Sequence, residues 1–247
     1  MSLDQSLHAS YVLLVLLGVA LFLLFRPTSH YSSPEKRSYW RLQAITIFAA
    51  LIGAKVAVLF GDALWPLHPV RDWTVLLWSG RSIVGALLFG FLVAEACKPL
   101  LGYRLPPNDR FAVILPFSIA TGRLGCWFTG CCLGIPMQGG IAMIAADGVS
   151  RYPAALVEAA FNVLSGIGLM LLLKRGVLPG RLFALYLVIY GMFRFVTENL
   201  RVTEKAFAGY SAYQWLSLAM IIAGGVALYV RRDARSPPLG PLAGVAR

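Results

Sequence analysis

Seven apolar runs that are nearly free of charge recur along the whole chain, and they constrain its fold more than any other feature. A helix needs roughly 20 mostly apolar residues to cross a bilayer. The runs lie at about Ser10–Phe25, Leu42–Phe60, Ile83–Cys97, Phe111–Phe128, Ala154–Leu173, Leu182–Val196 and Tyr213–Val230. We therefore predict an all-α polytopic membrane protein with seven transmembrane helices. The fourth run, with Pro116 and a glycine- and cysteine-rich end, is expected to be the least regular.

The composition agrees with this class. Of the 247 residues 13% are charged and 58% are hydrophobic, whereas soluble proteins are typically about 25% charged. No polar stretch is long enough for a second domain, so residues 1–230 are predicted to form one transmembrane domain and residues 231–247 a short tail. A cleaved signal peptide begins with a positive region. The stretch Met1–Ser10 contains no Lys or Arg, so we expect the first run to stay as a helix.

The basic residues predict an orientation. With the N-terminus outside, fourteen of the 22 Lys and Arg residues fall on the cytoplasmic side. Seven fall on the outer side, namely Arg71, Arg81, Arg123, Arg151, Arg194, Arg201 and Lys205. The positive-inside rule then places the C-terminal tail in the cytoplasm. The net charge is +11, and we expect the basic residues that produce it to lie at helix ends facing lipid headgroups. No nucleic-acid partner is expected, because no basic stripe is interleaved with aromatic residues.

Several charged side chains lie inside or at the ends of the apolar runs, where charge is expensive. They are Lys55, Glu95, Arg123, Glu158, Arg194 and Glu198. Arg194 and Glu198 are four residues apart and so share one helix face, where they can pair. One interpretation is a set of structural ion pairs between helices. The other is a polar cavity for an anionic headgroup, because the planar arginine fork donates two hydrogen bonds to phosphate.

The densest motif is TGRLGCWFTGCCLG at Thr121–Gly134. Its glycines permit unusual backbone conformations and close approach of a ligand to the main chain around Arg123. They are Gly122, Gly125, Gly130 and Gly134. The motif also contains three cysteines, Cys126, Cys131 and Cys132.

The role of these cysteines is open. A structural zinc site takes four Cys or His ligands, and His8, His30 and His68 are distant in sequence, so we expect no metal and no cofactor. A disulfide from Cys126 to Cys131 or Cys132 is one alternative. Buried thiols that pack as small apolar groups are another, and a reactive thiol with a pKa lowered by Arg123 is the third.

These motifs resemble the prolipoprotein diacylglyceryl transferase family over most of the chain. GRLGCWFTGCCLG is similar to the family signature, and the other similar stretches follow in the family's order. They are GAKVAVLFGD (Gly53–Asp62), SGRSIVGALLFG (Ser79–Gly90), RYPAALVEA (Arg151–Ala159), YGMFRFVTENLR (Tyr190–Arg201) and SAYQWLSLAMIIAGG (Ser211–Gly225). The family's seven helices, with the N-terminus outside, agree with the predicted topology.

The resemblance implies a bacterial inner-membrane enzyme. The family moves the diacylglyceryl group of phosphatidylglycerol to a cysteine of a lipoprotein precursor and releases glycerol phosphate. The catalytic candidates are Arg123, Arg194, Glu198, Cys126 and Cys131, of which Arg123 and Arg194 match the family's essential arginines and Glu198 also matches. Substrate-binding roles fall to Lys55, Glu95, Gly122, Gly125, Gly130, Glu158, Arg201 and Gln214.

Departures from the family pattern concern the polar groups that handle the acceptor. The family's histidine falls at Val84, its two asparagines at Cys126 and Thr129, and its glutamate at Cys131. Lys55 stands where the family usually has arginine. These differences leave open an acceptor other than a lipoprotein precursor.

A covalent role for the cysteines conflicts with the implied reaction. Transfer of a glyceryl group to an enzyme thiol gives a thioether, which is a poor leaving group, whereas a nucleophilic cysteine suits acyl or phosphoryl transfer. Two rival functions remain: a lipid or small-molecule transport or binding protein on the same scaffold, and a membrane thiol-redox protein.

Overall fold

The computed structural model describes residues 17, 32–64, 82–103, 109–205 and 208–232. Its long helices are α2 (Ser33–Val58), α4 (Ile83–Leu100), α5 (Asp109–Phe128), α6 (Ala154–Lys174), α7 (Leu182–Thr197) and α8 (Ala212–Val230). A π-helical turn, η2 (Leu59–Leu64), follows α2, and a 3-10 turn, η3 (Glu198–Leu200), follows α7. The predicted run Ser10–Phe25 lies outside the described residues, apart from Leu17.

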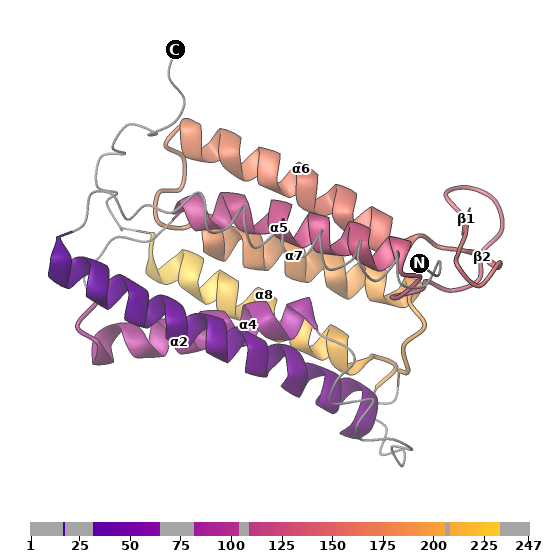
Figure 1. Cartoon of the computed structure of the whole chain (residues 1–247), viewed down its shortest axis with the longest axis horizontal. Helices are drawn as coiled ribbons and strands as arrows, with labels where there is room; N and C mark the ends of the chain where they lie inside the picture. Colours follow the sequence, from indigo (N-terminus) through magenta and orange to yellow (C-terminus); the bar gives the residue numbers. More distant parts are fainter. Residues whose placement is uncertain (1–16, 18–31, 65–81, 104–108, 206–207, 233–247) are drawn as a thin grey trace, which may run out of the picture.

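Within the described residues, five helices are long and apolar enough to span a membrane: α2, α4, α5, α6 and α8. Helix α7 has 16 residues and packs in the same bundle (Figure 1). Large apolar side chains such as Phe48, Leu164 and Val226 are exposed on the helices, as expected of surfaces that face lipid. The chain is a helical polytopic membrane protein.

The helices pack as three pairs, α2 with α4, α5 with α6, and α7 with α8. In Figure 1 the pair α2–α4 lies on one side, α6 on the other, and α7 and α8 between them. The backbones of α2 and α4 touch where Gly85 meets Gly53. A Cβ on Gly85 would lie 2.3 Å from the carbonyl oxygen of Gly53, so both helices need glycine at this crossing.

Local signals explain where two helices begin. Helix α2 starts earlier than its apolar run predicts, because Ser32 and Glu35 form a capping box with Pro34 in the first turn. The Ser32 backbone N–H donates to Glu35 Oε2 over 2.8 Å. Helix α8 begins at a second capping box, made by Ser211 and Gln214. The apolar run alone marked the membrane part of α2 and missed its polar first turns.

Helix α5 is more regular than expected. It was predicted to be the least regular segment, yet it is continuous through Pro116 to Phe128. The side chain of Pro116 is buried among neighbouring helices, and such packing lets a membrane helix tolerate proline. The irregular backbone begins after Phe128.

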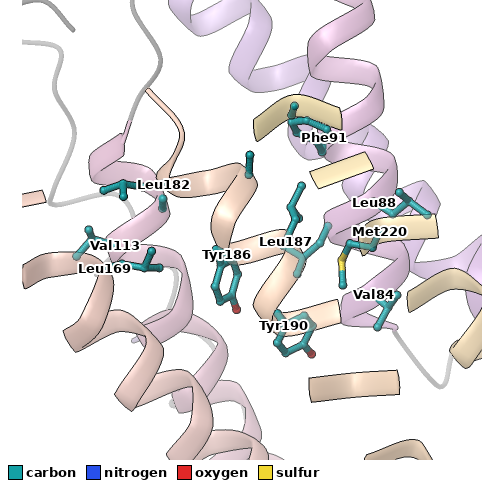
Figure 2. Close-up of a cluster of buried hydrophobic side chains, with 14 residues drawn as sticks. Val84, Leu88, Phe91, Val113, Leu169, Leu182, Tyr186, Leu187, Tyr190 and Met220 are labelled. Atoms are coloured by element: carbon teal, nitrogen blue, oxygen red, sulfur yellow. The ribbon is translucent and has the colours of Figure 1, made fainter. Parts of the chain in front are cut away.

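The apolar core lies between α4, α5, α6, α7 and α8. Figure 2 shows Tyr186, Leu187 and Tyr190 of α7 in its centre, with Val84, Leu88 and Met220 from α4 and α8 beside them. Tyr186, Leu187, Tyr190 and Met220 are all 0% exposed. One face of α7 is therefore completely buried in the bundle, although α7 is the shortest of the long helices.

A small antiparallel hairpin was not predicted. Its strands β1 (Met143–Ile144) and β2 (Ser150–Arg151) pair with Met143 opposite Arg151. An ion pair of 2.8 Å between Arg151 Nη2 and Asp147 Oδ2 closes the turn, and Arg151 holds the pKa of that carboxyl below its usual range. The hairpin lies at the end of the bundle where α5 ends and α6 begins (Figure 1).

Candidate active site

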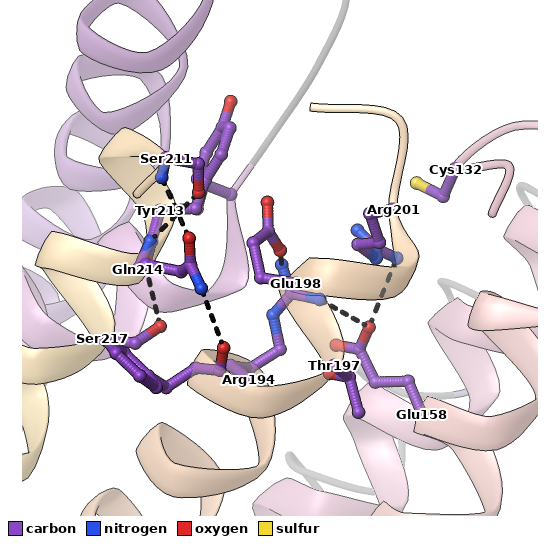
Figure 3. Close-up of polar contacts among 12 residues, drawn as sticks. Cys132, Glu158, Arg194, Thr197, Glu198, Arg201, Ser211, Tyr213, Gln214 and Ser217 are labelled. Atoms are coloured by element: carbon purple, nitrogen blue, oxygen red, sulfur yellow. Dashed lines mark hydrogen bonds and ion pairs between the residues drawn. The ribbon is translucent and has the colours of Figure 1, made fainter. Parts of the chain in front are cut away.

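Three arginines converge on the carboxylate of Glu158 at this end of the bundle. Arg123 Nε lies 3.0 Å from Glu158 Oε1. Arg194 Nη1 and Arg201 Nη2 lie 3.6 Å and 3.4 Å from Glu158 Oε2. Glu158 is 1% exposed, so its charge depends on these partners. We call Arg123, Glu158, Arg194, Glu198 and Arg201 the arginine cluster; Figure 3 shows Glu158, Arg194, Glu198 and Arg201.

The cluster needs three separate helices. Arg123 comes from the last turns of α5, Glu158 from the start of α6, and Arg194 from the end of α7. The expected pairing within α7 is present, because Arg194 Nη2 lies 2.6 Å from Glu198 Oε2 across one helical turn. The cluster therefore forms only when α5, α6 and α7 have packed together.

Two buried tyrosines extend the polar contacts between α6 and α7. The Tyr190 hydroxyl donates to Glu158 Oε1 over 2.5 Å, and the Tyr186 hydroxyl donates to Asn162 Oδ1 over 2.6 Å. Tyr186 and Tyr190 are four residues apart on α7, and Glu158 and Asn162 are four apart on α6. The two hydrogen bonds therefore lie one helical turn from each other. Sequence reasoning missed these residues. The i, i+4 spacing of polar groups in two otherwise apolar helices was the available signal.

The segment after α5 folds back over the cluster. The backbone N–H of Ile135 donates to the carbonyl of Leu200 over 3.0 Å, and Gly134 forms a β-bridge with Arg201. A Cβ on Gly134 would lie 2.2 Å from the carbonyl oxygen of Tyr152. Gly134 is therefore needed for the close approach of its backbone to Tyr152. Its β-bridge holds Arg201 beside the cysteine-containing loop.

The glycines of the motif play different roles, which corrects the sequence interpretation. Gly122 and Gly125 lie inside the regular helix α5 together with Arg123, so their backbone N–H groups belong to the helix. No irregular loop surrounds Arg123. Gly130 alone of the three predicted substrate-binding glycines has a left-handed conformation, with φ +65°.

The three cysteines of the motif lie together next to Arg123. Their Sγ atoms are all within 4.8 Å of one another, and the thiols are free. Arg123 Nη1 donates to Cys132 Sγ over 3.4 Å. Interactions with the Cys126 and Cys131 thiols, and the charges of Arg123 and Arg201, lower the pKa of Cys132. Cys132 was absent from the predicted site residues, although it is the cysteine that contacts the cluster.

A cavity of about 230 Å³ opens beside this group. Its walls include Cys131, Cys132 and Gly134 from the loop, Trp127 from α5 and Tyr152 from the segment before α6. Burial raises the pKa of the Tyr152 hydroxyl, so Tyr152 stays neutral. The cavity gives an approach to Cys131 and Cys132, and Cys132 in turn contacts Arg123.

Three other predicted residues are not members of the arginine cluster. Glu95 does not reach the cluster, because it pairs with Lys98 and, over 2.6 Å, with Arg231 at the opposite end of the bundle. Lys55 lies in the last turn of α2. Gln214 is buried in the capping box of α8, where Nε2 donates to the Phe195 carbonyl over 3.2 Å. Gln214 thus holds α8 against the end of α7.

The charges of the cluster do not cancel. Three arginines and two glutamates leave an excess of one positive charge in a largely buried site. The guanidinium groups carry about fifteen N–H donors, five each, whereas a carboxylate offers about four acceptor positions. The cluster therefore has both charge and donors left for an anionic ligand such as a phosphate.

The fold and this site define a multi-pass membrane protein with an anion-binding arginine cluster at one end of its helical bundle. A model of the prolipoprotein diacylglyceryl transferase family matches residues 3–230. The chain belongs to this family of membrane transferases, which act in lipoprotein biogenesis, and the resemblance seen in the motifs is confirmed.

Individual relatives agree. A phosphatidylglycerol–prolipoprotein diacylglyceryl transferase of Bordetella parapertussis is 30% identical over 243 residues, covering 90% of this chain and 90% of that protein. The protein of the same name from Thermotoga petrophila is 29% identical over 206 residues, covering 77% and 69%. One from Clostridium perfringens is 25% identical over 241 residues, covering 89% of each. These relatives are bacterial.

Proposed function

We propose that this chain transfers the diacylglyceryl group of phosphatidylglycerol to the cysteine thiol of a lipoprotein precursor. The acceptor sulfur forms a bond to the glyceryl carbon, the bond from that carbon to the phosphate oxygen breaks, and glycerol phosphate leaves. The proton lost by the thiol is taken up by the phosphate of the released glycerol phosphate. The donor and the acceptor are those in the names of the Bordetella and Thermotoga relatives.

The observation that carries the proposal is the convergence of Arg123, Arg194 and Arg201 with an excess of positive charge. As the carbon–oxygen bond breaks, negative charge grows on the phosphate oxygen. Donors placed before the reaction at the position of growing charge stabilise the transition state, and this effect is strong in a site of low dielectric. Arg123 and Arg194 are the residues that we assign to the phosphate.

The two glutamates hold these arginines in place. Glu158 contacts all three guanidinium groups and Glu198 contacts Arg194. A substrate phosphate that enters here uses the N–H donors that the carboxylates leave unfilled. Glu158 and Glu198 thus act as positioning residues, and Arg201 contributes to phosphate binding from the loop side.

The cavity beside Cys132 and Tyr152 supports an approach for the acceptor. Cys132 in its wall contacts Arg123, so an acceptor thiol that enters the cavity comes close to the arginine cluster. Cys126 and Cys131 shape this approach. They are not assigned as nucleophiles, since a thioether on the enzyme would not release its glyceryl group.

We also propose seven membrane helices in the bacterial inner membrane, with the N-terminus outside and residues 231–247 in the cytoplasm. The distribution of the basic residues supports this orientation. Lys98, Lys174 and Arg231 lie at the helix ends opposite the arginine cluster. The cluster and the hairpin then belong to the outer side.

The proposal is tested with purified protein in detergent, labelled phosphatidylglycerol and a peptide that carries a lipoprotein-precursor cysteine. We expect a labelled thioether on the peptide and release of glycerol phosphate. A peptide with serine in place of that cysteine is the matched control and stays unlabelled. If phosphatidylglycerol binds but is not converted in the presence of this peptide, the chain is a lipid-binding or transport protein, and the proposal is wrong.

A further inference from the structure

We propose that Cys126, Cys131 and Cys132 form a three-thiolate binding site for a soft monovalent metal ion, of which Cu(I) is the representative. The proposal does not depend on the transferase reaction. It rests on the arrangement of the three sulfur atoms, on the loop that holds them and on the cations beside them.

The sulfur atoms are close enough to share one ion. All three Sγ atoms lie within 4.8 Å of one another. Three thiolates around one ion, with metal–sulfur bonds of about 2.3 Å, stand about 4 Å apart. Side-chain movements of up to about 1 Å therefore convert the observed arrangement into a trigonal site.

The loop backbone is built to bring the thiols together. The N–H of Cys131 donates to the carbonyl of Cys126 over 3.0 Å, which folds the chain back on the end of α5. Gly130 and Cys132 both have left-handed conformations, with φ of +65° and 61°. This conformation is strained for cysteine, and strained residues concentrate at functional sites. Thr129 Oγ1 also lies 3.4 Å from Cys131 Sγ.

A cationic side chain lies against the three sulfur atoms. Three thiolates and one monovalent cation carry an excess of negative charge, which needs compensation in a partly buried site. Arg123 Nη1 contacts Cys132 Sγ at 3.4 Å, and the charge of Arg201 also acts on Cys132. The arginine cluster, with its excess of one positive charge, supplies part of this compensation without providing ligands.

The number of donors selects the kind of ion. Thiolates favour Cu(I), zinc and iron–sulfur clusters. Structural zinc takes four ligands in a tetrahedron, and iron–sulfur clusters commonly take four cysteines. Within the described part of the chain, the group contains three cysteines and no fourth Cys, His, Asp or Glu. Three soft donors suit trigonal Cu(I), and the adjoining cavity gives an entry path past Cys131 and Cys132.

The test is a competition for Cu(I) between the reduced full-length protein, purified in detergent under anaerobic conditions, and the chromophoric chelator bicinchoninate. We expect one Cu(I) per chain to leave the chelator. The single variants Cys126→Ser, Cys131→Ser and Cys132→Ser should each weaken binding by about 100-fold or more. Cys97→Ser is the matched control, since Cys97 lies on α4, far from the loop, and it should bind like wild type.

A second measurement does not depend on the folding of variants. X-ray absorption of the loaded wild-type protein should show three sulfur neighbours at about 2.3 Å. The proposal is overturned if the wild-type protein withdraws no Cu(I), or if the Cys126/Cys131/Cys132 triple serine variant withdraws as much as wild type. Stoichiometric zinc in the purified protein that is lost in Cys131→Ser would also overturn it.

Discussion

Glu158 Oε1 lies 3.0 Å from Arg123 Nε, and this buried ion pair joins the end of α5 to the start of α6. The same carboxylate accepts a hydrogen bond from Tyr190 on α7. One acidic side chain therefore connects three helices at the proposed phosphate site.

Arg123→Ala should abolish transfer, whereas Cys126→Ala and Cys131→Ala should only weaken it. Loss of a preorganised donor to developing charge costs about 3–4 kcal/mol, a rate loss of at least about a hundredfold. The measurement is transfer of labelled diacylglyceryl by equal amounts of folded variant. Arg175→Ala, an exposed change at the opposite end of α6, is the control. If Cys131→Ala is as inactive as Arg123→Ala, the thiol takes part in the chemical step.

Glu158→Gln should destabilise the protein as well as reduce transfer. It leaves Arg123, Arg194 and Arg201 buried near one another without their shared anion. Removing one partner of a buried ion pair costs about 3–5 kcal/mol. The measurement is thermal unfolding in detergent, with Glu95→Gln as the comparison. Glu95 is partly exposed, so its substitution should cost much less. Equal melting temperatures for the two variants would contradict the central role of Glu158.

Tyr190→Phe should lower stability by about 1.5–3 kcal/mol, because it removes a hydrogen bond to a charged group. Tyr186→Phe is the matched variant, since Tyr186 is equally buried and its hydroxyl donates to neutral Asn162. We expect a smaller loss of stability there and little effect on transfer. A larger loss of transfer in Tyr186→Phe than in Tyr190→Phe would contradict the assignment of Glu158 to the site.

The glycines of the motif should respond differently to alanine. Gly134→Ala places a Cβ 2.2 Å from the Tyr152 carbonyl oxygen, so the loop must move and Arg201 with it. Gly122→Ala meets no atom within 4 Å in its helix, and alanine favours helix. Transfer should fall strongly in the first variant and stay near wild type in the second. Similar activities in the two would show that the Gly134 contact does not position the site.

A reporter fused after Arg247 should report a cytoplasmic location. The reason is the fourteen-to-seven split of basic residues between the two sides. Paired fusions of alkaline phosphatase and green fluorescent protein make the measurement, because the first is active outside and the second fluoresces inside. An active phosphatase fusion would reverse the proposed orientation and place the arginine cluster on the cytoplasmic side.

The placement of helices was largely predictable because apolar length and helix formation are properties of local sequence. The runs beginning at Ile83, Ala154 and Leu182 match the starts of α4, α6 and α7. The pairing of Arg194 with Glu198 followed from their spacing on one helix. Local patterns did not reveal the polar start of α2 or the regularity of α5 through Pro116, because capping and tertiary packing decide those features.

The sequence by itself determined the membrane class, the positions of the described helices and the family, and it singled out Arg123, Glu158, Arg194 and Glu198 as candidate site residues. Only the tertiary structure decided that Glu158 is the shared partner of three arginines and that Glu95 belongs to the opposite end of the bundle. It also decided that Cys132 faces Arg123. Contacts between helices depend on how the helices pack. Arg123 and Glu158 are 35 positions apart, so no local sequence pattern shows that they are in contact.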